Sequence, residues 1–106
     1  MADKPNPQPL ATLLASHPEE CAAVVAVLAT VRGQFESLFI DAIHAAVDTH
    51  APGAMAEGAA ILDVGIAEGW IACNPWREYR IAGEADRYAI ARMGAAAWLA
   101  ARLSVS

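Results

Sequence analysis

Positive charge is scarce in this sequence. Its 106 residues include 7 Lys and Arg against 12 Asp and Glu, which gives a formal net charge of -5 at pH 7. A protein dedicated to nucleic acid carries a basic patch, and an anionic membrane attracts basic segments. This balance therefore argues against nucleic acid and membrane as partners. Because the acidic residues are scattered, the net charge indicates solubility rather than imitation of a phosphate backbone.

Long hydrophobic runs and a secretory leader are also missing. The longest apolar run without charge, Cys21 to Val31, is too short to span a bilayer. The opening residues, MADKPNPQPL, lack the basic and apolar regions of a signal peptide. We therefore expect a cytoplasmic protein whose two cysteines, Cys21 and Cys73, are free buried thiols. A disulfide between them would require an oxidising compartment.

Hydrophobic residues, many of them alanine, make up 57% of the chain, and charged residues make up 18%. This composition is typical of a folded helical protein, because alanine has the highest helix propensity. The length suits one domain. The prolines at alternating positions in residues 1–8 predict a disordered tail. We expect residues 9–106 to form a single, mainly α domain, a compact bundle of four to five helices.

The clearest helix start in the chain is Ser16-His17-Pro18-Glu19, after a short helical turn over residues 9–15. Ser16 and Glu19 match the capping-box pattern, in which each side chain bonds a free backbone N–H at the helix start. Pro18 suits the first helical position, where no backbone N–H is needed. We therefore expect a helix to begin at Pro18.

From Pro18 an apolar pattern with spacings of three and four continues to about Thr49. Its members are Val24, Leu28, Val31, Phe35, Leu38 and Ala42, with Phe39, Ile43 and Val47 widening the face. Gly33 leaves two alternatives open, namely a close-packing point in one long helix or a break between helices over 18–32 and 34–49. A turn over 49–53, a helix over 54–68 and a final helix over 84–103 complete the expected bundle.

The stretch GWIACNPWREYRI, Gly69 to Ile81, interrupts the alanine-rich pattern. Aromatic residues and Ile favour strands, and Asn74-Pro75 favours a turn between them. The stretch predicts a short β-hairpin near residues 70–81, with an irregular loop between two helices as the alternative.

The second half of the chain resembles a winged helix-turn-helix domain. The resemblance rests on Ile61-Leu62, then Gly69-Trp70-Ile71, then Tyr79-Arg80-Ile81 before a last helix. It implies DNA binding through the third helix, with the wing on the DNA backbone. The helix over 54–68 departs from this expectation, because it carries three acidic residues and no Lys or Arg. A winged-helix-like domain that binds protein suits the charge better, and a DNA-binding transcriptional regulator is the alternative.

Chemical motifs are weak. Asp41, His44 and Asp48 share one helix face, which suggests a small metal-dependent enzyme as a second alternative. They also continue a polar stripe of Thr30, Gln34 and Ser37, which indicates a solvated face. His17 and Cys21 have a chelating spacing but lack further ligands. We therefore expect no enzyme, no metal and no cofactor.

An aromatic and basic cluster is the best candidate for a binding site. Trp76, Arg77, Tyr79 and Arg80 belong to the residue types that dominate protein interfaces, although the tryptophans would equally fill a core. We expect the cluster to bind another protein, which makes this chain a regulatory or inhibitory module. The wide apolar face over 18–49 also suggests a homodimer or another homo-oligomer.

Overall fold

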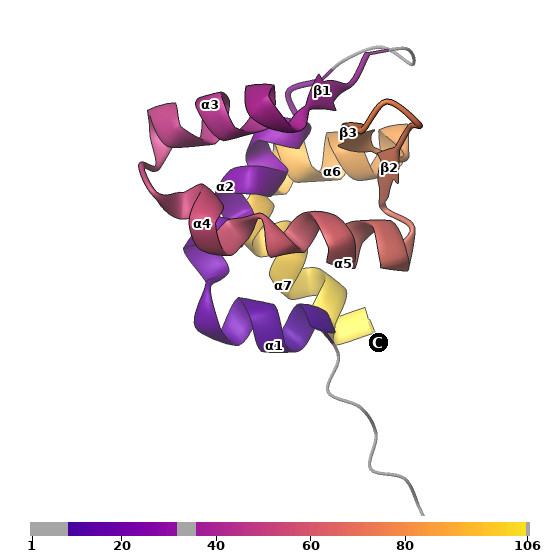
Figure 1. Ribbon diagram of the computed structural model, residues 1–106. Helices are drawn as coiled ribbons and strands as arrows, with labels where there is room; N and C mark the ends of the chain where they lie inside the picture. Colours follow the sequence, from indigo (N-terminus) through magenta and orange to yellow (C-terminus); the bar gives the residue numbers. More distant parts are fainter. Residues whose placement is uncertain (1–8, 32–35, 106) are drawn as a thin grey trace, which may run out of the picture.

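The computed structural model describes residues 9–31 and 36–105, which form a helical body with a small sheet at one end (Figure 1). The mainly α fold with a short hairpin near 70–81 is confirmed. The elements are α1 (Pro9–Ser16), α2 (Pro18–Leu28), β1 (Leu38–Phe39), α3 (Ile40–His50), α4 (Ala54–Gly58), α5 (Ala60–Glu68), β2 (Ile71–Cys73), β3 (Glu78–Ile81), α6 (Glu84–Met93) and α7 (Ala95–Val105). The expected tail over 1–8 and the break at Gly33 lie outside the described residues.

Of the two alternatives for residues 18–49, the single long helix is wrong. Helix α2 ends at Leu28, and the chain then enters the two-residue strand β1 before α3 begins at Ile40. Leu38 and Phe39 have helical spacing relative to Ala42 in the sequence, but they pair with β3 instead. The self-association expected from one wide apolar face over 18–49 therefore loses its premise.

The start of α2 also differs from the expected capping box. Ser16 is the last residue of α1, and His17 takes the N-cap position without a side-chain cap hydrogen bond. Pro18 does occupy the beginning of the helix, as expected. The sequence pattern failed because α1 reaches Ser16 and leaves it in a helical conformation, from which its hydroxyl cannot cap α2.

Two other expected helices are each divided. The helix over 54–68 becomes α4 and α5, which meet at Ala59, and the final helix becomes α6 and α7, which meet at Gly94. Gly94 has a φ of 92°, a left-handed value that glycine adopts without steric cost. The turn before α4 was expected, and the backbone N–H of Gly53 donates to Asp48 Oδ1 there at 3.0 Å.

The sheet is antiparallel in the order β1-β3-β2. Ile71 lies opposite Ile81, and both side chains are buried against the helices, so this face of the sheet joins the core. From α2 to β3 the elements are a helix, the strand β1, the three helices α3, α4 and α5, and the two-stranded wing of β2 and β3. If α4 and α5 are taken as one divided helix, this is the winged-helix order of helix, helix, turn, helix and hairpin, with β1 added.

Helix α2 lies at the centre of the helical body (Figure 1). Its buried side chains, Cys21, Val24, Val25, Val27 and Leu28, contact the surrounding helices. At the other side of the core, the rings of Trp70 and Trp98 pack edge to face with centroids 5.1 Å apart. The Arg102 guanidinium lies over both rings, and Trp70 Nε1 donates to Glu68 Oε1 at 2.9 Å.

Within the described part of the chain, no single helix is long and apolar enough to cross a membrane. Helices α1 and α2 together have sufficient length and apolar composition, but they are bent by 112° relative to each other.

Helices α2 and α4 approach closely at Gly58. A Cβ atom at this position would lie 2.5 Å from the backbone oxygen of Glu20 and 3.1 Å from Val24 Cγ2. Because a backbone atom cannot move aside as a flexible side chain does, the absence of a side chain at Gly58 is a requirement of this crossing.

We predict that Gly58→Ala lowers the free energy of unfolding by about 1–3 kcal/mol, since the added methyl overpacks the α2–α4 contact. Helix propensity alone would change stability in the opposite direction. Urea denaturation followed by circular dichroism measures the difference. Gly83→Ala is the control, because a Cβ there meets nothing within 4 Å and the expected change is below about 1 kcal/mol. Equal stability of Gly58→Ala and the wild type would contradict the close crossing.

Candidate functional site

The four residues expected to bind a partner lie in the wing, but they do not share one surface. Trp76 and Arg77 occupy the turn between β2 and β3 and are exposed, Trp76 to 72%. Tyr79 and Arg80 lie within β3 and are half-buried. Neighbouring residues of a strand point to opposite faces, so Tyr79 lies on the face of Ile81 and Arg80 on the outer face.

The turn that carries Trp76 is held by the side chain of Asn74. Its Oδ1 accepts hydrogen bonds from the backbone N–H of Trp76 at 3.0 Å and of Glu78 at 2.9 Å. Its Nδ2 donates to Glu78 Oε1 at 2.6 Å, and its backbone oxygen accepts from the Arg77 N–H at 3.0 Å. Pro75 fixes its own φ within the same turn. Trp76 is therefore exposed on a rigid turn rather than on a loose loop.

Arg77 has a φ of 62°, and it is the one non-glycine residue with a positive φ in the described part of the chain. Glycine adopts this conformation freely, whereas a residue with a Cβ is strained by about 1 kcal/mol or more. The strain is local, because the flanking hydrogen bonds of Asn74 hold the turn in place. Arginine at this position gives the exposed turn a cationic side chain directly after Trp76, which glycine would not provide.

Two further apolar residues adjoin this turn. Phe39 lies opposite Glu78 in the β1–β3 pairing, and the antiparallel direction brings the end of β1 to the turn's side of the sheet (Figure 1). Phe39 is 53% exposed and the following Ile40 is 39% exposed. We call the exposed residues Phe39, Ile40, Trp76 and Arg77 the wing-tip surface. It joins two segments that are separated by 35 residues of sequence.

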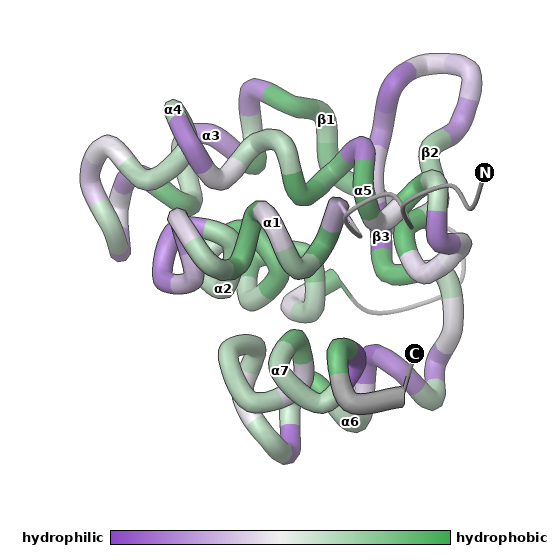
Figure 2. Tube along the Cα trace, turned by 90° about the horizontal axis from the view of Figure 1, so that it is seen from below, coloured by the Kyte–Doolittle hydropathy of each residue, from purple (hydrophilic) through white to green (hydrophobic). Residues whose placement is uncertain are grey.

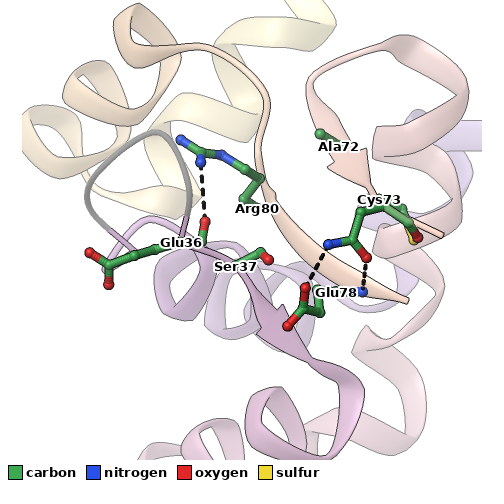
Figure 3. Close-up of a pocket in the computed structure, with 7 residues that line it drawn as sticks. Glu36, Ser37, Ala72, Cys73, Glu78 and Arg80 are labelled. Carbon is green, nitrogen blue, oxygen red and sulfur yellow. Dashed lines mark hydrogen bonds between the residues drawn. The ribbon is translucent and has the colours of Figure 1, made fainter. Parts of the chain in front are cut away.

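A shallow hollow of about 300 Å³ lies on the outer face of the sheet, next to the turn (Figure 3). It is lined by Glu36, Ser37, Ala72, Cys73, Asn74, Glu78 and Arg80. The Arg80 side chain crosses it and donates from one terminal nitrogen to the Glu36 backbone oxygen at 3.1 Å. This contact ties the segment before β1 to the wing, so Arg80 positions the wing-tip surface as well as lining the hollow.

Tyr79 lies on the opposite face, directly across from Cys73. Burial raises the pKa of Tyr79 above its ordinary value, and the neighbouring Cys73 thiol raises it further. The hydroxyl therefore stays protonated at neutral pH, and the ring packs against the core cluster. Of the four expected residues, Tyr79 is the one most involved in supporting the fold.

The two cysteines are free thiols in different environments. Cys21 is buried, as expected, whereas Cys73 is exposed, so the expectation of two buried thiols is wrong for Cys73. Cys73 is the last residue of β2, beside the turn, where the helices no longer cover the strand. Burial, followed by the charge of Glu20, raises the pKa of the Cys21 thiol from 9.0 to about 11.

The metal-binding candidates do not converge. Asp41, His44 and Asp48 are all exposed along α3, and Asp48 accepts the Gly53 hydrogen bond. His17 Nε2 lies 3.3 Å from Glu57 Oε2 rather than next to a ligand set with Cys21. Across residues 9–31 and 36–105, no group of three His, Cys, Asp or Glu side chains is arranged to hold a metal ion.

Comparison of the chain with protein-family models, curated proteins and solved structures finds no significant match. The winged-helix resemblance therefore concerns the order of the elements and a few short motifs. The chemistry of the wing is the remaining guide to function.

Phe39 and Ile40 are the members of the wing-tip surface that sequence reasoning missed. The spacing of Phe39 from Ile43 and Val47 is helical, which predicts a place for Phe39 on the apolar face of a long helix. No local signal identifies a two-residue strand whose partner follows 40 residues later. The residue types of Trp76 and Arg77 identify them as candidates, and the structure then places both in the turn rather than in the second strand.

We predict that Arg77→Gly raises the free energy of unfolding by about 0.5–1 kcal/mol, because glycine relieves the positive φ. Arg77→Ala is the matched control. It removes the same guanidinium but keeps a Cβ, so it should not stabilise the protein. Urea denaturation of the three proteins measures the effect. Equal stabilisation by both substitutions would mean that the charge, and not the backbone, causes it.

We predict that DTNB at pH 8 modifies one thiol of the folded protein, Cys73, and modifies Cys21 only after unfolding. Cys73→Ser should abolish the fast reaction, and two fast-reacting thiols in the folded protein would contradict the burial of Cys21.

We also predict a loss of stability at high pH. Above pH 9 the unfolded chain loses the Cys21 proton, whereas the folded protein keeps it to about pH 11. The stabilising contribution of Cys21 is therefore present below pH 9 and falls as the pH rises from 9 to 11. Cys21→Ala should remove this decrease from the pH profile of the free energy of unfolding, which urea denaturation at each pH measures.

Proposed function

We propose that this protein is a small non-enzymatic binding module that regulates or inhibits another protein through its wing-tip surface. Trp76 enters an apolar pocket of the partner, and Phe39 and Ile40 pack around the rim of that pocket. The observation that carries the proposal is the 72% exposure of Trp76 on a turn that Asn74 fixes with three side-chain hydrogen bonds.

The energetics of exposure favour a binding role for Trp76. Burying a large apolar side chain stabilises by about 1.5–3 kcal/mol, and this chain uses Trp70 and Trp98 in that way within its core. Trp76 leaves the same free energy available for association. Because the turn is already ordered, binding loses little backbone entropy, and most of the gain appears as affinity.

Arg77 specifies the chemistry of the partner. It is an exposed cation directly after Trp76, on a turn whose backbone strain glycine would relieve. We take the positive charge as the feature for which this strain is kept. An arginine next to an aromatic anchor pairs with a carboxylate at the rim of the partner's pocket. The partner surface is therefore an apolar pocket with an Asp or Glu at its edge.

The DNA-binding alternative receives little support from the surface that it requires. Helices α4 and α5 contain no Lys or Arg, and Asp63 is exposed on α5. Arg87 is buried and paired with Glu84, and Arg102 lies over the two core tryptophans. Binding to duplex DNA that weakens steeply with salt would revive this alternative.

We predict that Trp76→Ala leaves the fold intact and weakens the partner complex by at least about 30-fold, the loss of a hot spot of 2 kcal/mol. Wild-type protein captures partners from cells of its source, and titration of each purified partner then gives the dissociation constant. Tyr88→Ala is the matched control, because Tyr88 is an aromatic residue on α6 that is 63% exposed outside the wing-tip surface.

Circular dichroism and thermal unfolding of each variant test the fold before binding is compared. Partners retained equally by Trp76→Ala and Tyr88→Ala would exclude the wing-tip surface. Unfolding of Trp76→Ala would instead place this tryptophan in the core. A change in the partner's activity on titration with wild-type protein, absent with Trp76→Ala, tests the regulatory or inhibitory part of the proposal.

A further inference from the structure

A half-buried arginine without a carboxylate partner lines the hollow on the outer face of the sheet, which we call the outer-face hollow. Arg80 lines this hollow of about 300 Å³ together with Ser37 and Ala72 (Figure 3). Arg80 Nη1 donates to the Glu36 backbone oxygen at 3.1 Å, and Arg80 Nε makes a longer contact of 3.4 Å with the Ile81 backbone oxygen. Both acceptors are neutral carbonyl groups, and Figure 3 shows the Glu36 carboxylate turned away from Arg80. These contacts hold the guanidinium in place without neutralising its charge.

The other carboxylates near Arg80 are engaged elsewhere. Glu78 Oε1 accepts from Asn74 Nδ2 at 2.6 Å, within the turn. Hydrogen bonding to Arg87 holds the pKa of Glu84 below its ordinary value, and the charge of Arg80 contributes to a smaller degree. Both carboxylate oxygens of Glu84 nevertheless accept from Arg87, at 2.6 and 3.2 Å. Among the residues that the structure describes, none forms an ion pair with Arg80.

Two other partly buried arginines show what Arg80 lacks. Arg87 is paired with Glu84, and Arg102 Nε lies 3.7 Å from Glu68 Oε1. Burial removes water from a charged group, and a hydrogen-bonded carboxylate restores part of the stabilisation that is lost. A carboxylate from outside the chain would do this for Arg80, through guanidinium N–H groups that the two backbone oxygens leave free.

We propose that the outer-face hollow is a carboxylate subsite beside the wing-tip surface, in which Arg80 binds an Asp or Glu side chain of the partner. Ser37 lies beside Arg80 in the lining and offers its hydroxyl as a second donor (Figure 3). Asn74 lines the same hollow and holds the turn that carries Trp76, so a group in the hollow adjoins a partner that binds Trp76. That the occupant belongs to this partner rests on the proposed function, whereas the carboxylate chemistry of the hollow does not.

Other occupants fit the outer-face hollow less well. It is shallow, and its volume is at the lower end for pockets that enclose a free small molecule, so a side chain still attached to a protein fits better. Phosphate has more than one charge and would be repelled by Glu36 and Glu78 in the lining and by the net charge of -5. A cationic side chain would be repelled by Arg80. A carboxylate with a single charge avoids the repulsion by Arg80 and limits that by the acidic residues.

Nuclear magnetic resonance titration of the isotope-labelled full chain tests the carboxylate chemistry. The probes are N-acetyl-glutamate-N-methylamide and N-acetyl-glutamine-N-methylamide, which have nearly the same shape and differ in charge. Each is added to about 50 mM at constant ionic strength. We expect the glutamate probe to shift the Arg80 Nε–H and Ser37 amide signals with a dissociation constant of about 10 mM, as befits one isolated interaction. The glutamine probe should bind at least about 10-fold more weakly.

Arg80→Gln should raise the dissociation constant of the glutamate probe at least about 10-fold. Arg92→Gln is the matched control, because it removes the same charge from an exposed arginine of α6 outside the hollow lining. Trp76→Ala should leave this titration unchanged, so the subsite and the role of Trp76 are tested separately. Circular dichroism checks the fold of each variant. If Arg80→Gln does not fold, the two probes compared on the wild type still decide the question.

Absence of any shift at about 50 mM of the glutamate probe overturns the inference, as do equal shifts with both probes or equal effects of Arg80→Gln and Arg92→Gln. Tighter binding of inorganic phosphate than of the glutamate probe would make the hollow a phosphate site and also overturn it. With a purified partner whose binding requires Trp76, Arg80→Gln should weaken the complex at least about 10-fold more than Arg92→Gln does. If that complex is unaffected while the glutamate probe binds as expected, the hollow takes a free carboxylate, and its assignment to the partner is overturned.

Discussion

The fold depends on the enclosure of helix α2. After Glu19 and Glu20, its residues are apolar on every side, and a helix of this kind is stable only when other elements surround it. Helices α3, α4 and α7 pack against it from different directions, and the crossing with α4 is close enough to require glycine at position 58. With α2 enclosed, the wing and the outer sides of α1 and α7 are left to face the surroundings.

The three tryptophans show how this arrangement separates structural from binding residues. Trp70 follows the end of α5 and Trp98 lies in α7, so both reach the core where these elements meet, and Arg102 covers their rings. Trp76 is part of the same hairpin as Trp70, but it occupies the turn, beyond the reach of the helices. The same side chain therefore stabilises the fold at one end of β2 and stays available to a partner at the other.

Sequence patterns predicted the features that depend on local interactions. The hairpin follows from strand-forming residues on both sides of Asn74-Pro75, and the turn after α3 follows from Pro52 and Gly53. Features that depend on distant partners were not predicted. Strand β1 exists because β3 pairs with Leu38 and Phe39, and helical spacing of these residues concealed it. Trp76 and Arg77 could be proposed as binding residues from their residue types, whereas their place in the turn and the contribution of Phe39 follow only from the structure and its sheet register.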